Sequence, residues 1–215
     1  MNFKVNKLAG RSDMHLLRKI WHIVFGSICL FIYKSMDVEI TFWGYFATCF
    51  AIAGFGMDLL RLNNKKINDL VLKFMGPVMR DSEEKSFSGL PFYALGVGLS
   101  ILFFKEEIAV LSIMFLVFAD PIASFVGVNY GKGQILPNKS PQGATASFVT
   151  CVFITIFYFY QVEISDLNLI IFSVSAGIIG SLSELASAFN IDDNLTIPVL
   201  SGAGLTLVNG MIGIF

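Results

Sequence analysis

The sequence predicts an all-α integral membrane protein with about seven transmembrane helices and a cytoplasmic N-terminus. Apolar residues make up 55% of the 215 residues and charged residues 14%, whereas soluble domains are about a quarter charged. Apolar runs of roughly 20 residues recur between short polar connections, and a helix of that length crosses about 30 Å of hydrocarbon. The basic residues gather in alternate connections. We therefore expect a single membrane-embedded domain over residues 1–215.

The apolar runs define the predicted helices in chain order. Their approximate ranges are 19–35, 40–60, 89–104, 108–129, 144–161, 167–188 and 195–215. The first run begins among basic residues and lacks a small-residue cleavage site, so we interpret it as a retained helix rather than a signal peptide. Between the second and third runs, residues 64–76 place Ile67, Leu70, Val71 and Phe74 at helical spacing among charged residues. This pattern predicts an amphipathic helix on the cytoplasmic membrane surface.

The placement of basic residues predicts the orientation. With the N-terminus in the cytoplasm, all but two of the 15 lysine and arginine residues face that side, the exceptions being Lys34 and Lys105. Cytoplasmic connections are enriched in basic residues, so this arrangement is strongly favoured. The three cysteines lie singly in apolar runs without a C-x-x-C pair. We interpret them as packing residues rather than as a zinc site or a disulfide.

Ionisable residues within or beside the apolar runs fall on the same predicted side. Such residues are costly in a membrane and indicate function. The set consists of Arg18, Lys19, His22, Asp58, Arg61, Arg80, Glu83, Asp120, Lys139, Glu184, Asp192 and Asp193. Carboxylates beside lysines and arginines are typical of a site for a phosphate-bearing ligand with Mg²⁺. For the Asp192-Asp193 pair, a solvated turn with Asn194 capping the last helix is an alternative.

A strip of small residues follows the most deeply placed acid. Asp120, Ala123, Gly127 and Gly131 are spaced by three, four and four residues, so they share one helix face. Two interpretations remain open: a seam for close helix packing, or clearance for a ligand that approaches the backbone. The segment "GVNYGKG" is not a P-loop, because its glycine spacing is one residue short and Gly133 stands where Ser or Thr is required.

Four segments carry a family resemblance. Asp120, Ala123, Gly127 and Gly131 fit the pattern D-x-x-A-x3-G-x3-G, and "NKSPQG" fits the K-K-[ST]-x-E-G that follows it, with Asn138 and Gln142 as departures. The other segments are "RKIWHIVFG", "RDSEEKSFSG" and "IDDNLTIP". In these features the chain resembles the integral-membrane polyprenol kinases, the group that includes dolichol kinase, phytol kinase and CTP-dependent diacylglycerol kinase.

The resemblance implies a CTP-dependent kinase that phosphorylates a membrane lipid alcohol at the cytoplasmic leaflet. The alcohol would be a polyprenol, phytol or geranylgeraniol, dolichol or diacylglycerol. Implied Mg²⁺ ligands are Asp120, Asp192, Asp193 and Glu184. Implied nucleotide contacts are Arg18, Lys19, Arg80, Ala123, Gly127, Gly131, Lys139, Ser140, Gly143 and Asn194. Candidates for the catalytic base are Asp120, His22 and Glu83.

Two other classes remain as alternatives. A nucleotidyl transferase related to phosphatidate cytidylyltransferase would carry an H-G-G-x-x-D-[RL] ending, which this sequence lacks. A small-solute transporter would place charges near the membrane midplane, whereas the outer halves of the predicted helices are apolar. We expect no nucleic-acid partner, and the sequence does not indicate an oligomeric state.

Overall fold

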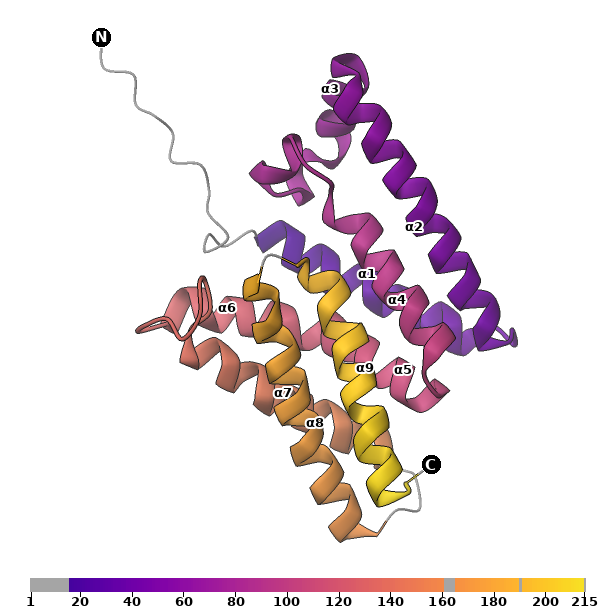
Figure 1. Ribbon diagram of the computed structural model, residues 1–215, viewed down its shortest axis with the longest axis vertical. Coiled ribbons are helices and arrows are strands. Elements are labelled where there is room, and N and C mark those ends of the chain that lie inside the picture. The colour runs from indigo at the N-terminus through magenta and orange to yellow at the C-terminus, as the bar shows by residue number, and fades with distance from the viewer. Residues whose placement is uncertain (1–15, 161–164, 190, 215) are drawn as a thin grey trace.

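The computed structural model describes residues 16–160, 165–189 and 191–214, which form helices joined by short connections (Figure 1). The predicted all-α class is confirmed. Residues 1–15 of the predicted domain lie outside the described part. The helices are α1 (Leu16–Ser35), α2 (Ile40–Asn63), α3 (Lys65–Met75), α4 (Gly89–Phe103), α5 (Glu106–Met114), α6 (Asp120–Tyr130), α7 (Pro141–Phe159), α8 (Asp166–Ala186) and α9 (Asp193–Ile212). Shorter turns are η1 (Gly76–Val78), η2 (Asp81–Glu84), η3 (Phe115–Ala119) and η4 (Ser187–Phe189).

Six helices of the described part are long and apolar enough to cross a membrane. They are α1, α2, the continuous segment Glu106–Tyr130 that joins α5, η3 and α6, and then α7, α8 and α9. The remaining apolar helix, α4, has 15 residues, about 22 Å at 1.5 Å per residue. The count of seven and the cytoplasmic N-terminus stay predictions.

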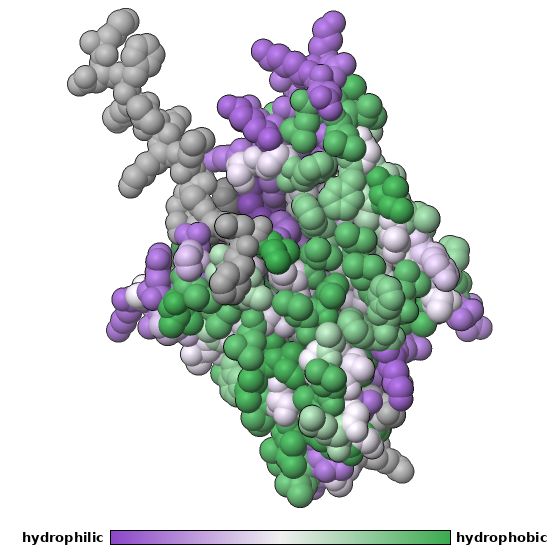
Figure 2. Space-filling model, in the orientation of Figure 1, coloured by the Kyte–Doolittle hydropathy of each residue, from purple (hydrophilic) through white to green (hydrophobic). Residues whose placement is uncertain are grey.

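The segment Glu106–Tyr130 forms the centre of the bundle. Over an 18-residue apolar stretch of this segment 67% is buried, compared with 11% over the corresponding stretches of α1 and α2. Leu111 and Phe115 are wholly buried against Phe159 of α7, Phe172 of α8 and Leu205 of α9. The outer surfaces of α1 and α2 are therefore available to lipid, and on the face shown in Figure 2 hydrophobic residues cover most of the bundle's length.

The helix α3 occupies the predicted amphipathic segment, 64–76. Asn64 caps it, because its side-chain oxygen accepts hydrogen bonds from the backbone N–H groups of Lys66 and Ile67. Leu70 and Phe74 are 57% and 72% exposed. Large apolar side chains that protrude from a short helix with lysines fit a helix lying on a membrane surface.

A π-helical turn interrupts the central segment just before Asp120. Pro121 has no N–H to donate to the carbonyl of Val117, so regular α-helical bonding fails at this point. The chain forms one wide turn over Phe115–Ala119 and then resumes as α6 at Asp120. Such turns are frequent at functional sites, and this one sets the direction in which α6 presents Asp120.

Candidate active site

A polar cavity of about 390 Å³ lies at one end of the bundle. The first turns of α1, α7 and α9 and the last turn of α8 meet at this end, and α6 borders the cavity along its length from Asp120 onward (Figure 1). Predicted site residues that line the cavity are Arg18, Lys19, His22, Arg80, Asp120, Ala123, Gly127, Gly131, Lys139, Ser140, Gly143, Glu184 and Asp193. Glu83 and Asn194 line an adjoining cavity instead. The convergence expected from charge placement is therefore present in the structure.

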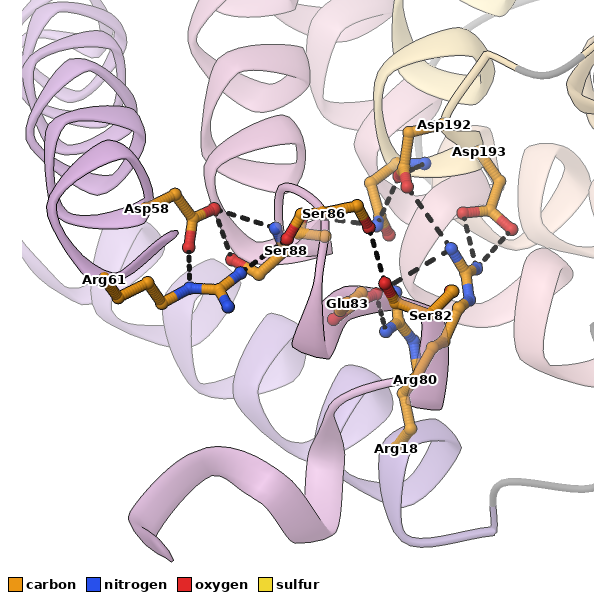
Figure 3. A network of polar contacts seen from close by, with 12 residues as sticks. Arg18, Asp58, Arg61, Arg80, Ser82, Glu83, Ser86, Ser88, Asp192 and Asp193 are labelled. Carbon is orange, nitrogen blue, oxygen red and sulfur yellow. Dashed lines mark hydrogen bonds and ion pairs between the residues drawn. The ribbon is translucent and has the colours of Figure 1, made fainter. Parts of the chain in front are cut away.

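Arg80 joins the connection after α3 to the start of α9 (Figure 3). Its Nη2 donates to both carboxylate oxygens of Asp193, at 3.0 and 2.9 Å, and its Nη1 donates to Asp192 at 3.3 Å. The adjacent carboxylates are thus held together by one guanidinium. Burial and the charge of Asp193 raise the pKa of Asp192 to about 6.

Asp192, rather than Asn194, caps α9. The Asp192 side chain accepts from the backbone N–H of Asn194 at 3.0 Å and from the Asn194 side-chain amide at 2.7 Å. The alternative in which Asn194 caps this helix is therefore wrong. The Asn194 amide also donates to the carbonyl of Gly89 at 3.3 Å, which connects α9 to α4.

Glu83 forms an ion pair with Arg18 of α1, in which Arg18 Nη1 donates a hydrogen bond to Glu83 Oε1 at 2.7 Å (Figure 3). Gly89 is necessary beside it, because an added Cβ would lie 2.5 Å from the Arg18 guanidinium and 2.8 Å from the Asn194 amide. Glu83 is 4% exposed. Since the Glu83 carboxylate is bound to Arg18, Glu83 positions the Arg18 guanidinium at the cavity.

A second buried pair holds the connection that carries Arg80 and Glu83. Arg61 Nε contacts Asp58 at 2.5 Å, and Arg61 Nη2 donates to the carbonyl of Ser86 at 2.6 Å. Asp58 accepts from the backbone N–H and the hydroxyl of Ser88 at 2.7 and 2.9 Å (Figure 3). Asp58 and Arg61 do not line the polar cavity. The sequence groups both residues with the site. In the structure they instead hold the connection between α3 and α4, whose Arg80 lines the polar cavity.

Lys139 reaches the cavity from a tight turn between α6 and α7. Leu136 and Lys139 pair across the turn, and Asn138 takes the left-handed conformation with φ of 61°. A type II turn has Pro at its second position and Gly or Asn at its third, which Pro137 and Asn138 supply. Lys139 Nζ donates to Glu184 of α8. Asn138 stands where the family pattern has its first lysine, and asparagine suits the left-handed position of the turn that carries Lys139.

The glycines form a packing seam that also borders the cavity. A Cβ at Gly143 would lie 2.9 Å from the carbonyl of Ala123, and one at Gly131 would lie 3.0 Å from the Ser140 side chain. Ser140 caps α7 by accepting from the N–H of Gly143 at 3.1 Å. The packing interpretation of the small-residue strip is therefore confirmed, because α6 and α7 pack closely. Gly127, Gly131 and Gly143 also line the cavity, and clearance for a ligand stays a prediction.

Among the described residues, several buried polar atoms around the polar cavity and its apolar neighbour have no hydrogen-bond partner. They are Lys19 Nζ, His22 Nε2, Glu184 Oε2 and Asn194 Oδ1. Buried polar atoms in native proteins are almost always hydrogen-bonded. Their gathering at one end of the bundle indicates a site whose ligand supplies the missing bonds.

The carboxylates do not form a ready-made metal cage. Within the described residues, no three His, Cys, Asp or Glu side chains gather as a metal site. Asp192 and Asp193 bind Arg80, and Glu184 binds Lys139. Asp120 lines the cavity and belongs to none of the described ion pairs. Mg²⁺ in kinases commonly takes one or two carboxylates together with substrate phosphates and water, and Asp120 fits that arrangement.

Comparison with known proteins identifies the family. Over 214 residues, the chain is 31% identical to CTP-dependent diacylglycerol kinase 1 of Saccharomyces cerevisiae, covering 89% of this chain and 72% of the relative. It is 35% identical to CTP-dependent diacylglycerol kinase 1 of Schizosaccharomyces pombe, over 73% of this chain and 77% of the relative. The chain belongs to the polyprenol and diacylglycerol kinase family. The resemblance seen in the sequence motifs is therefore confirmed.

The family also has a bacterial relative of similar extent. An uncharacterized protein of Rickettsia prowazekii is 30% identical over 87% of this chain and 91% of its own length. No model of a known protein family and no solved structure matches the chain.

The sequence did not predict two features of the site. It did not predict the π-helical turn, although Pro121 directly after an acid in an apolar run was a signal for irregular helix geometry. It also did not predict where the apolar cavities lie, since their location depends on how α1, α2 and α4 lie relative to each other.

Proposed function

We propose that this protein is a CTP-dependent kinase that transfers the terminal phosphate of CTP to the hydroxyl of a membrane lipid alcohol. Diacylglycerol is the first alcohol to test, because two relatives are named for it. One observation carries the proposal: the cationic polar cavity shares Arg18 and His22 with an apolar cavity beside it. Nucleotide phosphates and a lipid chain would therefore meet at these two residues.

The polar cavity has the chemistry to bind phosphates. Lys19 Nζ is buried and has no hydrogen-bond partner among residues 16–160, 165–189 and 191–214, and Arg18 and Lys139 line the same cavity. Phosphoryl transfer depends mainly on positioning and on stabilising charge at the transferred group. The small residues of α6 and α7 let a nucleotide approach the backbone.

Bound Mg²⁺ would neutralise charge on the phosphates, and Asp120 would hold it together with phosphate oxygens. Arg80 keeps Asp192 and Asp193 close to the cavity. In this arrangement the two acids set the position of Arg80. We assign no separate metal site to them or to Glu184.

His22 is the base that fits the geometry best. Its Nε2 is buried and has no hydrogen-bond partner within the part of the chain that the structure describes, and the ring lies where the polar and apolar cavities meet. The alcohol oxygen would attack the terminal phosphorus while its proton passes to His22 Nε2. The bond between the β–γ bridging oxygen and that phosphorus breaks, and CDP leaves with the oxygen. Glu83 is less suited, because Arg18 occupies its carboxylate.

The experiment is a transfer assay in nanodiscs with CTP labelled on the terminal phosphate, Mg²⁺ and a panel of alcohols. The panel contains diacylglycerol, a polyprenol, dolichol, phytol and geranylgeraniol. The proposal requires a labelled lipid monophosphate and CDP, both lost on chelation of the metal. Release of pyrophosphate would instead identify a nucleotidyl transferase, and solute flux without nucleotide would identify a transporter. Assays with inside-out and right-side-out vesicles test the cytoplasmic placement of the site.

A further inference from the structure

Two apolar cavities, of about 250 and 520 Å³, follow the polar cavity into the membrane-spanning part of the bundle and share lining side chains with their neighbours, so that together they mark an apolar path. The larger one lies between α1, α2, α4 and α5, and its walls are almost wholly hydrophobic. We infer that this path, called here the lipid groove, holds one hydrocarbon chain of the lipid alcohol while the hydroxyl lies at His22. The inference rests on the proposed function and specifies where that function binds its acceptor.

Shared side chains connect the cavities in order. Arg18 and His22 line both the polar cavity and the smaller apolar one. Phe25, Leu90 and Tyr93 line both apolar cavities. The Tyr93 ring lies 4.8 Å from the His22 ring and 6.5 Å from the Phe25 ring, measured between centroids. The unpartnered His22 nitrogen therefore stands at the point where the apolar path begins.

The length of the groove fits a lipid chain. Along α1 it extends from His22 to Tyr33, where Tyr33 donates a hydrogen bond to Glu106. Eleven helical residues rise about 16 Å, roughly half of the ~30 Å hydrocarbon thickness. This is the distance that one lipid chain covers in one leaflet.

The width of the groove excludes a helix of another protein. Along α1 the larger cavity, about 520 Å³, extends from Phe25 to Tyr33, about 12 Å, which gives a mean cross-section of about 43 Å², or roughly 7 Å across. An α-helix with its side chains is about 10–12 Å across. A single hydrocarbon chain is the occupant that matches both the width and the apolar wall.

Chain-length selectivity tests the groove. Ala47 is half-buried, lines the larger cavity and lies eleven residues, about 16 Å, along α2 from Asp58 beside the polar end. Ala53, on the same helix, is exposed and lines none of these cavities, so Ala53→Phe is the matched control. We expect Ala47→Phe to lower kcat/KM for dioleoylglycerol about tenfold or more, because filling an apolar pocket discriminates on this scale.

The short substrate and the control variant make the result decisive. Dioctanoylglycerol should be used by Ala47→Phe at close to the wild-type rate, and Ala53→Phe should leave both substrates unaffected. Equal losses for the two substrates, or equal effects of the two variants, would overturn the groove. As a check on folding, the size-exclusion profile and the CTP affinity of each variant are compared with those of the wild-type protein.

Photo-crosslinking keeps the inference testable apart from catalysis. A diacylglycerol with a diazirine midway along one acyl chain is irradiated with the wild-type protein without CTP. Adducts should concentrate in the groove segments 25–33 of α1 and 90–101 of α4, and excess unlabelled diacylglycerol should remove them. Adducts spread over the exposed faces of α7 and α8 without competition would refute the groove. If the protein shows no kinase activity but groove adducts form and unlabelled diacylglycerol removes them, the proposed function is refuted and the lipid-binding groove is retained.

Discussion

The buried Asp58–Arg61 pair gives the most quantitative prediction. The Arg61 side chain is 1% exposed and that of Asp58 6%. Arg61→Met removes the guanidinium that bonds to Asp58, to the Asn68 side chain at 3.0 Å and to the carbonyl of Ser86. Asp58 would keep its two bonds from Ser88 but lose its only described ion-pair partner. Removing one partner of a buried pair costs about 3–5 kcal/mol, so the free energy of unfolding should fall by about that amount.

A double-mutant cycle measures the pair itself. Asp58→Leu with Arg61→Met leaves no uncompensated charge, so the double variant should be more stable than the sum of the single losses predicts. We expect a coupling of about 2–3 kcal/mol between the two positions. The assay is reversible unfolding in mixed detergent micelles, followed by tryptophan fluorescence.

Loss of the Asp58–Arg61 pair should lower activity as well as stability, because the connection that the pair holds carries Arg80 and Glu83. Arg61→Met should also weaken CTP binding, although Arg61 does not line the polar cavity. A loss of less than about 1 kcal/mol, typical of an exposed pair, would refute the reasoning. Unchanged CTP affinity in a destabilised variant would refute the proposed link to the site.

Other predictions concern the turn, the helix seam and the cation. Asn138→Gly should retain stability and activity, whereas Asn138→Val should lose about 1–2 kcal/mol because a branched residue resists the left-handed conformation; thermal unfolding checks this. Gly143→Ala should lower activity and stability, since its Cβ would lie 2.9 Å from a backbone carbonyl, and Gly56→Ala, with open space around the added carbon, should not. Lys139→Met should weaken CTP binding about 10–100-fold, as expected for loss of a charged hydrogen bond, and calorimetry measures it; unchanged affinity would exclude Lys139 from the nucleotide site.

Much of the fold could be predicted because membrane helices follow simple constraints. Length, apolarity and basic-residue placement indicated the helices and the end at which polar groups gather. The predicted segment 64–76 agrees with α3, Lys65–Met75, which Asn64 caps and which Gly76-Pro77 follows.

The pairing of charged groups could not be predicted from the sequence. Asp58 and Asp120 are both acids in apolar runs, yet Asp58 is bound by Arg61 and Ser88 whereas Asp120 lines the polar cavity. That difference depends on which helix ends approach each other. Asp192 likewise looked like a metal ligand, and the structure shows that it caps α9 and binds Arg80.

The central claim is that Asp120 serves phosphoryl transfer in a cavity that receives both CTP and a lipid alcohol. The most direct measurement compares wild type and Asp120→Asn for transfer of labelled phosphate from CTP to diacylglycerol, with protein folding checked by size exclusion. We expect a rate at least about a hundredfold lower for Asp120→Asn, because the charge stabilisation by a held metal ion amounts to several kcal/mol. Wild-type turnover by a folded Asp120→Asn protein would contradict it.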